Sequence, residues 1–227
     1  MATELADGVY AVPQTIDRGG QTATFTPAAV ETPRGLLLLD VGFPHALDRL
    51  ETHLGEMGRE VADVWGVVLT HQDGDHAAGL SALRERADPV VFAHAECAPF
   101  VDGRRDPIKG DDGDRYPPSP VDVELTDGTT LRTDAGPLEV VYTPGHAPGH
   151  VSLYLSEPRV LIAGDALTAS DGSLAGPSEE HTLEMDGAIE SVGRLADYDI
   201  EQTLCYHGGQ AAEGTGAIAR LWTELAE

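Results

Sequence analysis

The fold of this chain is decided by one stretch, VWGVVLTHQDGDH at residues 64–76. Its first half, residues 64–69, is apolar and rich in β-branched side chains, which predicts a buried strand. Four side chains that can bind a metal follow within six residues: His71, Asp73, Asp75 and His76. Gly74 lets the backbone turn tightly between them. We therefore expect a strand, a loop that carries the four side chains, and a helix over residues 77–86.

The mixture of imidazole and carboxylate groups in this loop is typical of a site for Zn²⁺, Mn²⁺ or Fe²⁺. His71 and Asp73 can face one ion while Asp75 and His76 face another. The alternative is a solvated polar loop whose aspartates cap the following helix. The metal interpretation is favoured because unrelated loops seldom place so many ligand types at such close spacing.

The length and pattern of the chain predict one globular unit. The 227 residues contain no repeat of about 20–50 residues and no low-complexity linker, so we predict a single domain over residues 1–227. No apolar run approaches the roughly 20 residues of a membrane span. The acidic first residues lack the basic start of a secretory signal, and a cytoplasmic location is expected.

The net charge is −25, from 39 acidic and 14 basic residues, and Lys109 is the single lysine. Such a surface repels the phosphates of nucleic acids and anionic membranes, so neither is expected as a partner. It also repels itself in dilute buffer, and concentrated salt relieves that repulsion. We therefore expect a halophilic protein from a salt-rich cytoplasm; the alternative is an acidic protein of a mesophile. The sequence leaves the oligomeric state open.

Further histidines and aspartates stand at the ends of other predicted strands. The apolar strand 35–39 ends at Asp40, and strand 138–142 runs into TPGHAPGH at 143–150. Strand 159–163 ends at Gly164-Asp165, and a short strand over 203–206 precedes His207. Asp40 is expected to orient a metal-bound histidine, although an aspartate before Gly42 could also simply form a turn.

Other segments receive structural interpretations. Amphipathic patterns predict helices over 46–57, 182–197 and 216–226, and Asp127-Gly128 predicts a hairpin between 121–125 and 130–132. The segments 102–120 and 174–181 are expected to flank the substrate entrance. His94 is expected to be structural and His150 to order its own loop, while His181 is an open candidate for substrate contact.

The ordered motifs THxxxDH at 70–76, TPGH at 143–146, GD at 164–165 and YHGG at 206–209 resemble those of the metallo-β-lactamase fold hydrolases. The resemblance extends from about Gly8 to the last predicted helix. It implies an α+β fold, an αβ/βα four-layer sandwich with a dinuclear metal site at one edge of two facing sheets.

The resemblance also implies a ligand set. The first metal would take His71, Asp73 and His146; the second would take Asp75, His76 and His207; Asp165 matches the bridging carboxylate. The family usually has histidine where this chain has Asp73. The charges of three carboxylates and one hydroxide balance those of two divalent ions. This ligand set is more negative than the family's usual one and favours harder metal ions. Two Zn²⁺ ions are still the first expectation, with Mn²⁺ or Fe²⁺ as alternatives.

The activity implied is hydrolysis of a small ester, thioester or lactone, as in the lactonase and glyoxalase II-like branch. Asp75 would orient the attacking water and carry a proton to the leaving group. A GxSxG nucleophile motif is missing from the sequence, in line with a metal-activated nucleophile. Two alternatives remain open: a non-haem iron oxidoreductase similar to persulfide dioxygenases, and a binding protein with a relic site.

Overall fold

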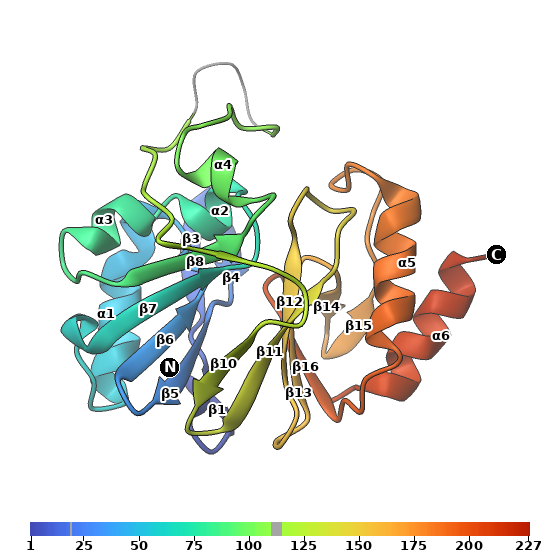
Figure 1. Ribbon diagram of the computed structural model, residues 1–227. Helices are drawn as coiled ribbons and strands as arrows, with labels where there is room; N and C mark the ends of the chain where they lie inside the picture. The colour runs from blue at the N-terminus through green and yellow to red at the C-terminus, as the bar shows by residue number, and fades with distance from the viewer. Residues whose placement is uncertain (19, 110–114) are drawn as a thin grey trace.

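Two β-sheets lie face to face at the centre of the molecule, and helices cover their outer faces (Figure 1). The computed structural model describes residues 1–18, 20–109 and 115–227. Residues 110–114 of the predicted entrance segment 102–120 lie outside the described residues. The arrangement of helix, sheet, sheet and helix confirms the predicted α+β four-layer sandwich.

The first sheet has seven strands, and its last four, β6 to β9, run parallel. In spatial order the strands are β1 (Thr3–Ala6), β2 (Val9–Ala11), β5 (Ala28–Thr32), β6 (Gly35–Leu39), β7 (Val64–Leu69), β8 (Val90–His94) and β9 (Val123–Leu125). A separate hairpin precedes β5 and is made of β3 (Gln14–Arg18) and β4 (Gln21–Phe25).

The second sheet has six strands, of which β13 and β16 pair in parallel and the other neighbours are antiparallel. In spatial order they are β10 (Thr130–Thr133), β11 (Gly136–Tyr142), β12 (Val151–Leu155), β13 (Val160–Gly164), β16 (Gln202–Cys205) and β17 (Gly209–Ala211). The short hairpin of β14 (Thr168–Ser170) and β15 (Ser173–Ala175) lies between β13 and the next helix.

Helices α1 to α4 belong to the half of the chain that forms the first sheet, and α5 and α6 to the other half. Their bounds are α1 (Leu47–Glu56), α2 (Gly74–Ala77), α3 (Leu80–Arg84), α4 (Ala98–Val101), α5 (Met185–Leu195) and α6 (Thr215–Leu225), with 3-10 turns η1 (Pro44–Ala46) and η2 (Val61–Asp63). In the described part of the chain, none of the helices has the length and apolar character that crossing a bilayer requires.

Strand β6 illustrates how the layers are held together. Leu37 and Leu39 join the core between the two sheets, while Leu36 and Leu38 join the core under α1. All four side chains are buried, because successive residues of a strand point to opposite faces and both faces of this strand are covered. This explains why the sequence of β6 is apolar throughout rather than alternating.

Two local predictions were wrong. The segments around Asp127-Gly128 do not form a hairpin: β9 pairs with β8 in the first sheet, and β10 pairs with β11 in the second. Asp127 and Gly128 lie between β9 and β10, where the chain passes from the first sheet to the second. The predicted helix 77–86 is also different, since α2 already begins at Gly74 and a separate helix, α3, follows it.

Candidate metal centre

The ligand-rich motif spans the end of β7 and the first turn of α2. β7 ends at Leu69, and α2 begins at Gly74, so Asp75 and His76 lie on a helix rather than on the predicted loop. Asp73 occupies the N-cap position, but in the described structure its side chain makes no capping hydrogen bond. Its carboxylate instead faces the histidines, which argues against the helix-capping interpretation of this aspartate.

The structure brings His71, Asp73 and His146 together as one potential ligand group. Oδ2 of Asp73 lies 3.3 Å from Nε2 of His71 and 3.2 Å from Nε2 of His146. Ligand atoms about 2.0–2.2 Å from a tetrahedral ion lie about 3.3–3.6 Å from one another. The spacing of these three atoms therefore fits one metal ion.

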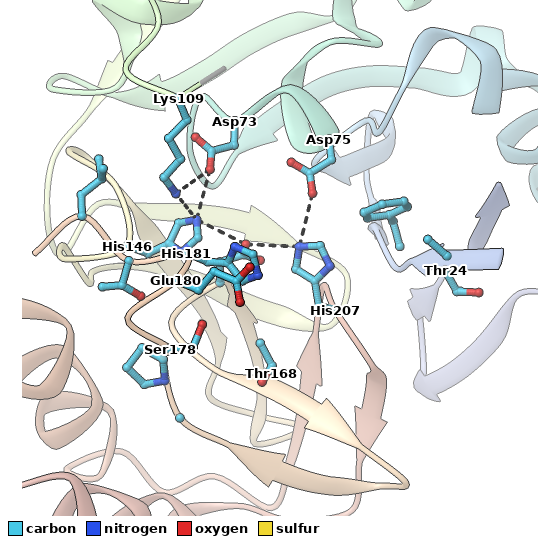
Figure 2. A pocket seen from close by; sticks show the side chains of 17 residues that line it. Thr24, Asp73, Asp75, Lys109, His146, Thr168, Ser178, Glu180, His181 and His207 are labelled. Carbon is cyan, nitrogen blue, oxygen red and sulfur yellow. Dashed lines mark hydrogen bonds and ion pairs between the residues drawn. The ribbon is translucent and has the colours of Figure 1, made fainter. Parts of the chain in front are cut away.

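A second group consists of Asp75, His76 and His207. Nε2 of His207 lies 3.3 Å from Oδ2 of Asp75. Phe25 contacts the His207 ring edge-on at 5.3 Å between centroids, so the β3–β4 hairpin forms a wall beside this group. Members of both groups line the same cavity, where they lie side by side (Figure 2).

Asp165 lies between the two groups. Its Oδ2 is 3.4 Å from Nε2 of His146 and 3.3 Å from Nε2 of His207, while its Oδ1 is 3.3 Å from Nε2 of His76. One carboxylate thus approaches ligands of both groups. This is the arrangement that a bridging carboxylate requires.

The unpaired polar atoms of the site also fit metal binding. Nε2 of His71, Nε2 of His76 and Oδ1 of Asp165 are buried and have no hydrogen-bond partner in the described part of the protein. Two of them face each other and the third faces Oδ2 of Asp73, each at 3.3 Å and without a hydrogen bond, so these buried atoms need a partner of another kind. A divalent ion coordinated by imidazole and carboxylate supplies it.

Asp40 holds His76 in the orientation that metal binding needs. Its Oδ2 lies 2.8 Å from Nδ1 of His76 and accepts the hydroxyl of Thr70 at 2.8 Å. Its Oδ1 accepts the backbone N–H of Thr70, also at 2.8 Å. The Nδ1–H of His76 therefore points to Asp40 and Nε2 is left for an ion. Asp40 is buried and has a positive φ of 66°, a strained conformation that often occurs at functional sites.

His150 lies behind the site and fixes the backbone of Asp165. Its Nε2 accepts the Asp165 backbone N–H at 2.9 Å, and its Nδ1 lies 3.0 Å from the carbonyl oxygen of Thr143. These contacts require a neutral ring with the proton on Nδ1. Burial lowers the pKa of His150 well below its ordinary value, which keeps the ring neutral.

The carboxylates of the site are held in the charged form. Burial alone would raise the pKa of Asp75, but the charge of His76 and the bond to His207 outweigh it and lower that pKa to about 2. Burial likewise opposes charge on His207, yet its bonds to Asp165 and Asp75 raise its pKa to about 9. Without a metal, protonated histidines therefore balance the carboxylates, and metal binding must release those protons.

Two further residues, Lys109 and Tyr206, contact the ligands, and the sequence predicted a role for neither, although Tyr206 belongs to the YHGG motif. The Nζ of Lys109 donates to Oδ2 of Asp73 at 2.7 Å and lies 2.8 Å from Nε2 of His146 (Figure 2). Tyr206 stacks on His76 at 3.6 Å between ring centroids, and its hydroxyl donates to the backbone oxygen of Asp75. The unusual feature of Lys109 in the sequence is that it is the single lysine of an acidic chain.

The ligand groups open into a cavity of about 770 Å³. Residues 176–178 and 180–183 form much of its lining, and those up to His181 belong to the predicted entrance segment 174–181. Of the described part of segment 102–120, Lys109 lines the cavity. His94 lies elsewhere and stacks on Tyr142.

Known proteins resemble this chain in sequence. The probable metallo-hydrolase YflN of Bacillus subtilis is 28% identical over 203 residues, which cover 78% of this chain and 76% of that protein. A hydroxyacylglutathione hydrolase of Ruegeria pomeroyi is 28% identical over 120 residues, and the match spans only 39% of its length. Both proteins are named as hydrolases.

Solved structures agree. A metallo-beta-lactamase family protein of Thermus thermophilus is 28% identical, with a TM-score of 0.75 over 97% of this chain and 80% of that one. A metallo-beta-lactamase of Pontibacter korlensis, at 17% identity, has a TM-score of 0.78 over 100% of this chain and 99% of its own, a likeness of fold alone. The family model described as the metallo-beta-lactamase superfamily matches residues 28–207, and this chain belongs to that superfamily.

Proposed function

We propose that this protein is a metal-dependent hydrolase with a dinuclear site that cleaves a small ester, thioester or lactone. The observation that carries the proposal is the pair of ligand groups with Asp165 between them. The first ion would be held by His71, Asp73 and His146, and the second by Asp75, His76 and His207. Zn²⁺ suits these ligands, and the extra carboxylate makes Mn²⁺ or Fe²⁺ reasonable alternatives.

A bound pair of divalent ions would lower the pKa of water towards neutrality and polarise a carbonyl group. The protein would supply the proton transfers. The side chain of Asp75 is 22% exposed and faces the cavity, so it can accept a proton from the attacking water and return it to the leaving group. Asp40 and His150 would keep His76 and Asp165 in position.

The cavity supports a small substrate. Its volume of about 770 Å³ lies in the range of small-molecule sites, and the lining formed by 176–178 and 180–183 is polar around Ser178, Glu180 and His181. The thioester part of the proposal is supported by relatives named as hydroxyacylglutathione hydrolases. The lactone and ester parts rest on the same carbonyl chemistry.

The test combines metal analysis with a substrate panel. Protein purified without chelator should contain two ions per chain and should hydrolyse at least one member of a panel of esters, thioesters and lactones. Removal of the ions should abolish turnover, and their return should restore it. As a control, a His71→Ala, His207→Ala double variant should lose both the ions and the activity.

Two outcomes would contradict the proposal. A protein that takes up no metal would favour the relic binding site. One iron per chain, with an iron absorption band and oxygen consumption in the presence of a persulfide, would instead favour the oxidoreductase alternative.

A further inference from the structure

The single lysine of this acidic chain lies at the candidate metal centre. The Nζ of Lys109 is 2.7 Å from Oδ2 of Asp73 and 2.8 Å from Nε2 of His146. These are two of the three atoms that form the first ligand group. Among the described residues that line the cavity, Lys109 is the only lysine or arginine. Figure 2 shows its side chain beside Asp73, with the ammonium group pointing towards His146.

The ammonium group and a metal ion need the same electron pairs. The lone pair on Nε2 of His146 can accept an N–H of Lys109 or bind an ion, but it cannot do both. The carboxylate oxygen of Asp73 is shared more easily, yet an ion bound to it would stand beside a positive ammonium group and be repelled. Filling the first ligand group therefore requires Lys109 to move away.

In the described structure the second ligand group has no lysine or arginine against its ligand atoms, and an ion there displaces only the protons of its histidines. The charged contacts of Asp75 and His207 in the described structure are with each other and with Asp165. His76 is already oriented by Asp40, so little rearrangement opposes binding there. The two groups have the same number of ligands, and the lysine ammonium group against the first one distinguishes them.

We propose that Lys109 is a built-in cation that competes with the first metal ion, so that the two positions fill in sequence. The group of Asp75, His76 and His207 fills at low metal concentration. The group of His71, Asp73 and His146 fills only at higher concentration, when the ion displaces the ammonium group. This inference rests on the proposed dinuclear site and adds an order of loading to it.

The experiment is a titration of the metal-free protein with Co²⁺, followed by visible absorption and by calorimetry. The wild-type protein should show two separated uptake steps. In Lys109→Met the second step should become about 10- to 100-fold tighter, the usual scale for groups that contact metal ligands, while the first step stays unchanged. Lys109→Gln, which is neutral and polar, provides a second test should the Met variant fold poorly.

Two controls separate charge from general disturbance. Lys109→Arg keeps the positive charge and should keep the weak second step. Arg115→Met removes a cation from the same segment, but in the described structure the hydrogen bonds of that guanidinium go to the backbone oxygens of Arg105 and Phe100, so neither step should change. Circular dichroism spectra of all variants check the fold.

The outcomes are distinct. Unchanged constants in both neutral variants, or a tightening of the first step instead of the second, would overturn the role of Lys109 and leave the dinuclear hydrolase standing. A Lys109→Arg protein that behaves like Lys109→Met would overturn the role of charge. Failure of every protein to bind any ion would remove the proposed function and this inference with it.

Discussion

At the scale of single residues, Asp73 and Asp75 differ although they stand two positions apart. Asp73 lies within ion-pair distance of His71, His146 and Lys109, whereas the ion pair found for Asp75 in the described structure is with His207. Asp75 also remains partly open to the cavity. We therefore propose metal binding for both, and proton transfer for Asp75 alone.

Asp75→Asn should lower kcat by about 10²- to 10⁴-fold with both ions retained, because the amide keeps an oxygen ligand but carries no proton. Asp73→His is the comparison: it restores the ligand usual in the family and should retain both ions and keep kcat within about tenfold. Steady-state kinetics and metal content on the same samples provide the measurement. A near wild-type kcat in Asp75→Asn with two ions bound would show that this role is wrong.

His150 allows a test of the support behind the site. His150→Leu leaves the Asp165 N–H without its acceptor, and the free energy of unfolding should fall by about 1–3 kcal/mol. The loss should depend on pH. The folded-state pKa of His150 is lowered, so its contribution is fully present above the unfolded value of about 6.5 and is lost as the pH falls below it.

Urea unfolding of both proteins between about pH 5 and pH 8 measures this difference. The gap between wild type and His150→Leu should be widest at pH 8 and should narrow towards pH 5. A gap that widens in acid would mean that the histidine is charged in the folded protein.

At the scale of elements, the strands that carry the site could be predicted from the sequence. Strand β7 shows why: an apolar run ended by polar ligands marks both the strand and its functional end. The hairpin at Asp127-Gly128 could not be predicted correctly, because a turn signal specifies a local bend and not which sheet the next strand joins. The position of Lys109 at the metal centre could not be predicted either, because its segment has no hydrophobic periodicity that would show where in the fold it lies.

The turn after β16 gives a prediction at this scale. Gly208 has a φ of +94°, and a Cβ at this position would meet the carbonyl oxygen of Ala169 at 1.7 Å. Gly208→Ala should therefore destabilise the fold by more than the roughly 1–3 kcal/mol of backbone strain alone and should displace the neighbouring His207. Gly128→Ala is a matched control, because its φ is +73° but the space around it is open.

Thermal melts and metal content of the two alanine variants make the comparison. Gly128→Ala should lose some stability and keep both ions, whereas Gly208→Ala should lose more stability and part of its metal. Equal losses in the two variants would mean that the contact with Ala169 is unimportant.

At the scale of the whole molecule, the main feature is the excess of acidic side chains. The net charge is −25, and arginines such as Arg84 and Arg86 already pair with carboxylates at the surface. Most acidic groups are left without a cation, so repulsion between them opposes folding at low ionic strength. The halophilic origin predicted from the sequence rests on this imbalance and stays a prediction.

The melting temperature should rise steeply between about 0.1 M and 3 M KCl, because the screening length falls from about 10 Å at the lower concentration to below about 3 Å at the higher one. Circular dichroism melts across that range measure the rise. A matched series in a neutral osmolyte distinguishes charge screening from general stabilisation. A melting temperature that is constant in salt would count against the halophilic interpretation.

The candidate ligands come from both halves of the sandwich: four follow β7 in the first sheet, and His146, Asp165 and His207 follow strands of the second. Ions held between them would act as a reversible cross-link, worth about 2.7 kcal/mol when free metal is a hundred times its dissociation constant. The lifetime of the protein against cellular proteases would then follow the metal supply. A cell starved of the metal would lose the protein itself as well as its activity.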